Sequence, residues 1–242
     1  MKKVWNFLVN AVNAVKAFLH ITPKQTLKPS SGVNENMPKI TKKRTAREIM
    51  GKNFFGIEEA KEHFKINPTA MQLIVLTQIP YTEEMLDACK NTHILRAIFP
   101  ISIEEIRVMY PRLFRKDIKA LRLKGKLNKG VDGEVFWCLI RKSALPGSYF
   151  DDPQMQRAVL GKNNVIPSAR VMVCTIIGHY LATGEKLFSN SSIHFDQNSK
   201  DRRVVVGPFT ENGLAINYYG TSFRPSYPGT CMAKKAEKVL VL

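Results

Sequence analysis

A long apolar segment limits the folds open to this chain. It lies within "PSARVMVCTIIGHYLATGEKLF", where Ser168 is a typical N-cap and Gly184 a typical helix stop. Apolar residues occupy nearly every face of the helix between them, so the helix has to be enclosed by other elements. Arg170 and His179 interrupt the segment and argue against a membrane span. We therefore expect a central core helix in a globular domain.

Capping residues and helical spacing predict a series of short helices before residue 111. They lie in the segments "TKKRTAREIM", "IEEAKEHF", "PTAMQLIVLTQI", "YTEEMLDACKN" and "SIEEIRVMY". Asn67 and Pro68 begin the third, which is apolar enough to be buried. Thr82 caps the fourth, and Ser102 forms a capping box with Glu105 in the fifth. Two further segments, "THILRAIFPI" and "GEVFWCLIRKSA", are predicted strands.

The C-terminal part has a different pattern. The segments "SSIHFD", "RRVVVGPF" and "GLAINYYG" alternate apolar and polar residues, which is typical of half-buried strands. Asn212-Gly213 predicts a hairpin with a type I′ turn, and the tail beyond it is mostly loop that ends in a basic helix or strand. Helices come first and strands last. We therefore expect an α+β fold, in which a helix-rich N-terminal part packs with a C-terminal antiparallel β-meander.

Residues 1–20 are predicted to form a separate amphipathic helix. Its apolar stripe consists of Trp5, Leu8, Val12, Val15 and Leu19. Asparagines interrupt the apolar run, which disfavours a signal peptide. The helix could dock on its own domain, on a protein partner through residues 4–19, or, less favoured, on a membrane surface. Residues 21–40 contain prolines and a Ser-Ser-Gly and form a flexible linker, so a single α+β domain is expected over residues 41–242.

The chain is strongly basic. It carries 37 Lys and Arg against 20 Asp and Glu, a formal net charge of +17. Most of the surplus lies in residues 1–50 and 101–150, whereas residues 51–100 hold slightly more acids than bases. Positive charge concentrated in this way attracts polyanions such as nucleic acid. A host whose proteins are generally basic is the alternative explanation.

Positive charge is densest in the stretch "PRLFRKDIKALRLKGKLNKG". Phe114, Ile118 and Leu121 have helical spacing and predict an amphipathic helix that Gly125 ends. Its polar side has a single acid, Asp117, whereas a solvated helix face normally mixes both signs. We therefore predict a nucleic-acid-binding or nucleic-acid-associated protein that contacts mainly the phosphates of DNA or RNA. The predicted contacts are Lys42, Lys43, Arg44, Arg47, Arg112, Arg115, Lys116, Lys119, Arg122, Lys124, Lys126 and Lys129.

The sequence predicts no catalytic residue, cofactor or metal site. It lacks G-x-x-x-x-G-K-[ST], G-x-G-x-x-G, H-E-x-x-H and G-x-S-x-G, which disfavours nucleotide hydrolysis, dinucleotide redox chemistry and the common hydrolase layouts. The alternative function is a structural or assembly protein, of phage or mobile-element type, that docks through its N-terminal helix. The third is a metal-dependent nuclease that uses Asp132, Glu134, His194 and Asp196. The four cysteines form no C-x-x-C pair, so we expect a reducing, cytoplasmic location.

One resemblance extends over most of the chain, from Thr45 to Tyr219. The segments that carry it occur in the order "TAREIMGKNFFGIEEAKEHF", "THILRAIFPISI", "TIIGHYLATGEKLF" and "RVVVGPFTENGLAI". Together they resemble a set of uncharacterised bacterial hypothetical proteins. The resemblance implies a bacterial or phage-associated origin and one contiguous domain. Because that set has no assigned activity, cofactor or site, it implies no functional residue here.

Overall fold

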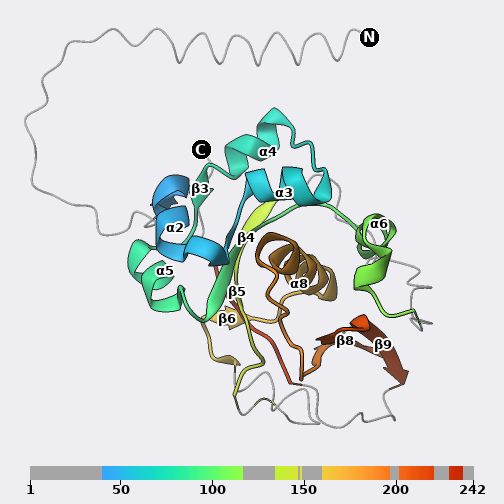
Figure 1. The fold of residues 1–242 in the computed structure, drawn as a ribbon. Helices are drawn as coiled ribbons and strands as arrows, with labels where there is room; N and C mark the ends of the chain where they lie inside the picture. The colour runs from blue at the N-terminus through green and yellow to red at the C-terminus, as the bar shows by residue number, and fades with distance from the viewer. Residues whose placement is uncertain are drawn as a thin grey trace, which may run out of the picture. The chain divides into compact units, whose positions relative to one another are not determined.

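The computed structural model describes residues 40–116, 134–146, 148, 160–196, 202–220 and 229–236, all within the unit Pro38–Leu242. The predicted N-terminal helix and the linker up to residue 39 lie outside the described residues, and the expected domain boundaries stay predictions. The described part has an α+β fold, as the sequence predicts (Figure 1).

The described chain contains α-helices, two short 3-10 helices and strands in three sheets. The helices are α2 (Lys43–Met50), η1 (Gly51–Asn53), α3 (Ile57–Phe64), α4 (Ala70–Val75), α5 (Glu83–Cys89), α6 (Ile103–Met109), η2 (Pro111–Leu113) and α8 (Ala169–Thr183). The strands are β1 (Thr41–Lys42), β2 (Phe54–Phe55), β3 (Gln78–Ile79), β4 (His93–Ile98), β5 (Phe136–Arg141), β6 (Asn164–Val165), β7 (Ile193–Asp196), β8 (Arg202–Thr210), β9 (Gly213–Gly220) and β10 (Ala233–Lys234).

The core is built on a five-stranded sheet with the order β2-β4-β5-β10-β6. β2 runs parallel to β4, and the other neighbouring pairs are antiparallel. β4 and β5 confirm the two predicted strands, and every residue of β4 is buried. β10 comes from the C-terminal tail and lies between β5 and β6, a pairing that the sequence does not predict.

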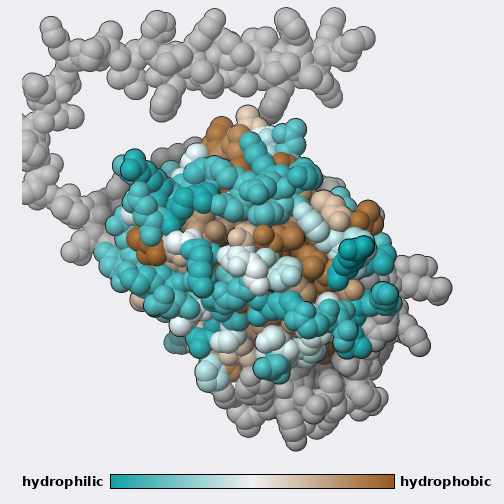
Figure 2. Space-filling view, in the orientation of Figure 1, coloured by the Kyte–Doolittle hydropathy of each residue, from teal (hydrophilic) through white to brown (hydrophobic). Residues whose placement is uncertain are grey.

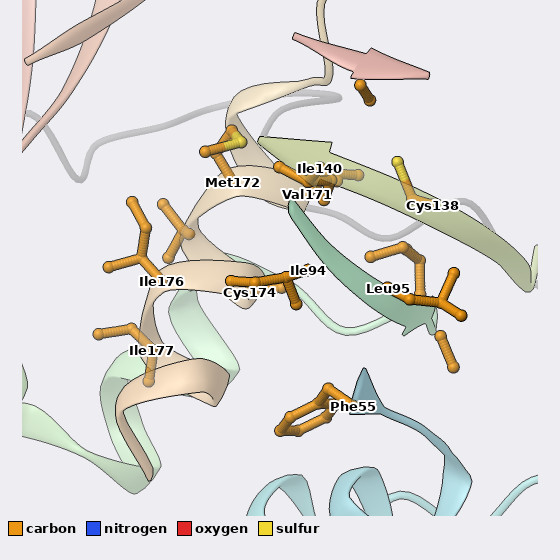
Figure 3. Close-up of a cluster of buried hydrophobic side chains, with 14 of the residues drawn as sticks. Phe55, Ile94, Leu95, Cys138, Ile140, Val171, Met172, Cys174, Ile176 and Ile177 are labelled. Atoms are coloured by element: carbon orange, nitrogen blue, oxygen red, sulfur yellow. The ribbon is translucent and has the colours of Figure 1, made fainter. Parts of the chain in front are cut away.

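The long apolar segment forms α8, which confirms the predicted core helix. The Ser168 side chain accepts a hydrogen bond from the Val171 N–H (3.3 Å), and Gly184 ends the helix with a φ of 74°. In Figure 1, α8 lies on one side of β4 and β5, with α2 and α5 on the other. Figure 3 shows Ile94 and Ile140 of the sheet beside the helix. No helix in the described ranges, α8 included, has both the length and the apolar character of a membrane span.

The helix caps predicted at Thr82 and Ser102 are confirmed. Thr82 Oγ1 accepts a hydrogen bond from the Met85 N–H (3.1 Å) at the start of α5. Ser102 Oγ accepts one from the Glu105 N–H (3.1 Å), and the Glu105 carboxylate accepts one from the Ser102 N–H (2.7 Å), which completes the capping box of α6. Gly51 follows the last residue of α2, as expected of a helix stop.

The prediction of a buried helix in "PTAMQLIVLTQI" is wrong in two respects. α4 begins after Thr69, which forms a capping box with Gln72, and not at Pro68. None of its six residues is buried. Leu76 and Ile79, which follow the helix, enter the core in its place. The segment therefore supplies a short apolar helix on the surface, held by its caps and by the strand β3 that follows it.

The three C-terminal strands form the predicted antiparallel meander, in the order β7-β8-β9. Thr210 pairs with Gly213 across the hairpin, so the turn is where the Asn-Gly signal predicts it. The turn type differs. A type I′ turn requires a positive φ at both central residues, whereas here Gly213 has a φ of 96° and Asn212 is not among the residues with positive φ.

The predicted helix that begins near Arg112 is wrong over its first residues. Pro111–Leu113 forms a 3-10 turn, and Phe114 is extended, with φ −118° and ψ 145°. Phe114 pairs with Leu214 of β9, and the Arg115 N–H donates to the Leu214 carbonyl (3.2 Å). A Cβ on Gly213 would lie 2.6 Å from the Phe114 carbonyl carbon, so the close approach requires glycine. Phe114 is thus buried by a strand-like pairing and not by a helical stripe.

Candidate functional site

The predicted cations near the start of the domain are largely neutralised by acids. Lys43 Nζ lies 2.9 Å from Glu58 Oε1, and Arg47 bonds both Glu58 (3.0 Å) and Glu59 (3.1 Å). The hydrogen bond to Glu59 raises the pKa of Arg47 above its usual value. Arg44, on the exposed side of α2, pairs with Glu48 four residues later (3.0 Å). Of this group only Lys42 is exposed without a described acidic partner.

The second predicted group is described only in part. Arg112 and Lys116 are exposed, and Arg115 is half-buried. The structure therefore places two of these cations on the surface beside the edge of β9. The remaining predicted contacts, Lys119, Arg122, Lys124, Lys126 and Lys129, lie outside the described residues. Continuity between this group and the first stays a prediction.

A groove that the sequence does not predict lies between two separate parts of the chain. One wall runs from Phe64 to Gln72, through the end of α3 and the start of α4. The other runs from Phe99 to Met109 and includes α6. The groove has a volume of about 640 Å³, which is within the range of sites that hold ligands. We call it the α4–α6 groove.

Local structure on both sides fixes the shape of the α4–α6 groove. Lys65 ends α3 with a left-handed φ of 54° and turns the chain toward α4. On the other side, the buried Arg170 guanidinium of α8 donates to the Phe99 carbonyl (2.7 Å) and holds the segment between β4 and α6. The Tyr110 hydroxyl donates to the His63 carbonyl and ties the two walls together. The groove is therefore anchored to the core through charged and aromatic side chains.

Exposed apolar side chains lie on both helices that contribute to the groove. Met71 and Ile74 of α4 are 68% and 58% exposed, and Val108 of α6 is 70% exposed. Val75 adds to the same helix surface. Figure 2 shows hydrophobic surface where α4 and α6 lie in Figure 1. Single exposed apolar residues are ordinary, but several on the two helices that contribute to a groove are typical of an interaction site.

Acidic side chains border the groove on its α6 side. Glu104 and Glu105 are among the residues that line it, in the first turn of the helix. Glu104 pairs with Arg107 (2.5 Å), and Glu105 is held by its capping bond. Lys65 is the single cation among the lining residues. The groove thus combines apolar walls with a mildly acidic border in a chain that is otherwise strongly basic.

A histidine–carboxylate pair joins the end of α8 to two other elements. His179 Nε2 lies 3.2 Å from Glu185, whose carboxylate also binds Lys142 (2.7 Å) and Lys52 (3.5 Å). Burial acts to raise the pKa of Glu185, but hydrogen bonds from Lys142 and His179 prevail and lower it to about 2. His179 itself is 2% exposed and is therefore a core histidine of α8. The network ties the end of α8 to the segments that carry Lys142 and Lys52.

No group of three His, Cys, Asp or Glu side chains within the described ranges is arranged to hold a metal ion. Of the residues considered for a nuclease, Asp132 lies outside the described residues, and the side chains of His194 and Asp196 are not described. The nuclease interpretation is therefore not tested by this structure.

Comparison with known proteins yields no relative: no family model, curated protein or solved structure matches this chain. The interpretation of the α4–α6 groove therefore depends on its own geometry. No sequence pattern predicts the groove, because its walls come from segments that carry ordinary helix signals. The one local signal is "AMQLIV", an apolar run too short to form a core helix of its own.

Proposed function

We propose that this protein is an interaction module whose α4–α6 groove binds the apolar face of an amphipathic helix from a partner protein. The observation that carries the proposal is the exposure of Val108, which lines the groove, and of Met71 and Ile74 on α4, whose first turn forms part of one wall. Residues 71, 74 and 75 are three and four positions apart, so they form one stripe along α4 against which a second helix can pack. This groove is separate from the N-terminal helix through which the sequence predicts that an assembly protein would dock.

The energetics favour a helical partner. Fully burying one large apolar side chain contributes about 1.5–3 kcal/mol, and the exposed residues of α4 and α6 present several such side chains. A helix laid in a groove buries its apolar residues at every third or fourth position and satisfies its own backbone. Glu104 and Glu105 at the border favour a partner with cationic residues on its polar face.

Binding of a designed probe tests the proposal. The probe is a fluorescently labelled Leu–Lys peptide with helical spacing, and its scrambled sequence serves as the peptide control. We expect anisotropy to show saturable binding of the ordered peptide. The double variant Met71→Lys/Ile74→Lys should weaken that binding at least tenfold. Val165→Lys, at an exposed apolar residue of β6, is the matched control and should bind as the unaltered protein does. Equal loss in both variants, or equal binding of the scrambled peptide, contradicts a specific groove.

Nucleic-acid binding is the second candidate, favoured by the net charge of +17 and by the exposed Arg112 and Lys116. Contact would be mainly to phosphates and therefore dependent on salt. The test is a titration with labelled single- and double-stranded DNA and RNA at low and moderate salt. We expect Arg112→Glu/Lys116→Glu to weaken binding more than Lys61→Glu/Lys162→Glu, an equal charge change at other exposed lysines. Salt-independent binding, or equal effects of the two variants, contradicts this candidate.

A further inference from the structure

A second cluster of polar groups lies on the five-stranded sheet, on the face opposite to α8. The β4–β5 register places His93 directly opposite Arg141. The β5–β10 register places Lys234 opposite Leu139, two residues before Arg141 and therefore on the same face. Three basic side chains from three neighbouring strands thus share one corner of this face, at the end where β4 begins and β5 ends.

The orientation of His93 follows from its hydrogen bond. Its Nδ1 lies 2.8 Å from Thr92 Oγ1, which is also 3.4 Å from the Cys89 carbonyl. Nδ1 is satisfied by Thr92 in either tautomer, because the hydroxyl can donate or accept, so Nε2 is the ring nitrogen that the described residues leave without a partner. His93 is 3% exposed, and Nε2 has no hydrogen-bond partner within the described residues. A buried polar atom without a partner is unusual in a folded protein.

The charges around His93 are positive. Burial and the charges of Lys234 and Arg141 together lower the pKa of His93 to about 4. The same two cations act on the thiol of Cys89 at the end of α5. The acids of adjoining segments are engaged elsewhere, since Asp87 binds Lys90 and Glu185 binds Lys142. In the described part of the chain, neither Arg141 nor Lys234 forms an ion pair with a carboxylate.

We infer that Arg141, Lys234 and His93 form a binding site for a phosphate group. Two cations held near each other without a counter-ion repel, and a bound anion would relieve that repulsion. A guanidinium and an ammonium are the side chains that proteins use to bind phosphate oxygens. Arg141 and Lys234 are both half-exposed, so an anion can reach them from solvent. Arg141 Nε, which is buried and has no partner in the described residues, supplies a further unused donor.

His93 makes this site sensitive to pH. A bound anion favours the protonated imidazole, so anion binding raises the pKa of His93. By linkage, the protonated site binds the anion more tightly, and affinity increases as pH falls through the pKa of the bound form. The other groups near this corner are Cys89, Asp87 and Lys90 of the α5 end, Lys142 after β5, and Lys235 after β10.

The experiment is an NMR titration of the imidazole signals of the full chain with inorganic phosphate at several pH values. Sulfate, which does not titrate in this range, is run in parallel. We expect saturating anion to raise the pKa of His93 by at least one unit and to leave the imidazole signals of the half-exposed His63 unchanged. Lys234→Met should weaken anion binding at least tenfold. Lys235→Met, at the exposed next residue, is the matched control and should not.

Two further arms make the outcome decisive. His93→Gln keeps both cations and should retain sulfate binding but lose its pH dependence. A short 5′-phosphorylated oligonucleotide that binds at least tenfold tighter than inorganic phosphate identifies nucleic acid as the source of the group, whereas equal affinity identifies the free anion. If tens of millimolar phosphate leave the signals of His93 unchanged in folded protein, the inference is wrong. Arg141 and Lys234 would then only stabilise the C-terminal end of α5 electrostatically.

Discussion

Arg96 extends from β4 into the core, between the Phe55 ring and α8. Its guanidinium carbon lies 3.8 Å from the centre of that ring, and the residue is 2% exposed. Nε and Nη1 have no hydrogen-bond partner in the described residues, and burial lowers the pKa of the guanidinium to about 10. Cation–π contacts with Phe55 and Phe64 offset part of the cost of burying this charged guanidinium. Gly178 is the residue of α8 that leaves room for the group.

Replacement of Gly178 tests this packing. Glycine to alanine within a helix normally stabilises a protein by about 1 kcal/mol. Here a Cβ on Gly178 would lie 2.2 Å from Arg96 Nη1, so we expect Gly178→Ala to lower the free energy of unfolding by about 1–3 kcal/mol. Urea denaturation measures the change. The double variant Arg96→Met/Gly178→Ala should recover most of the loss, because the obstructing group is removed. A Gly178→Ala protein that is more stable than the original contradicts the assignment.

Among the helices and strands, the sequence correctly predicted features that depend on interactions within one helical turn. The caps of α5, α6 and α8 depend on residues within one turn, and all three are where the sequence places them. Burial depends on partners that are distant in sequence, and here prediction failed. Phe114 has the spacing of a helical stripe, but it pairs with Leu214 of β9. α4 is as apolar as a core helix, but the sequence does not indicate that the sheet already has helices on both faces.

The groove could not be predicted for the same reason. Its walls, near residues 64–72 and 99–109, meet only because Arg170 and Tyr110 tie separate segments together. The cationic cluster of His93, Arg141 and Lys234 depends on β10, a two-residue strand from the tail. A two-residue strand is too short to show a periodic pattern in the sequence. The register of β10, and the site that depends on it, are therefore seen only in the structure.

The exposure of α4 leads to a prediction about stability. Met71 and Ile74 are mostly exposed, so we expect Met71→Lys and Ile74→Lys each to change the free energy of unfolding by less than about 0.5 kcal/mol. Leu76 follows the helix directly, and Leu76→Ala removes a fully buried side chain. The backbone carbonyl of Leu76 also accepts a hydrogen bond from the Trp137 indole N–H (3.2 Å). The substitution should cost about 2–5 kcal/mol in urea denaturation. Comparable losses at Ile74 and Leu76 would mean that α4 is part of the core.

Across the protein, the four cysteines are distributed over several separate elements of the fold. Cys89 ends α5, Cys138 lies in β5, Cys174 in α8 and Cys231 just before β10. All four are free and buried. Burial raises the pKa of each thiol, that of Cys138 to about 12. Because the thiolate is the reactive form, none of the four should react quickly in the folded protein.

Thiol labelling in urea therefore tests whether residues 41–242 form one domain. In the native protein at pH 8, we expect a chromogenic disulfide reagent to label fewer than one thiol over minutes, and in denaturant all four. If the five-stranded sheet, α8 and the tail strand unfold together, the four thiols become reactive in one transition, at the urea concentration where circular dichroism reports loss of helix. Two separated transitions, with Cys89 and Cys138 in one and Cys174 and Cys231 in the other, would divide the chain into two domains. Because β10 pairs with both β5 and β6, and α8 packs on β4, the structure predicts a single transition.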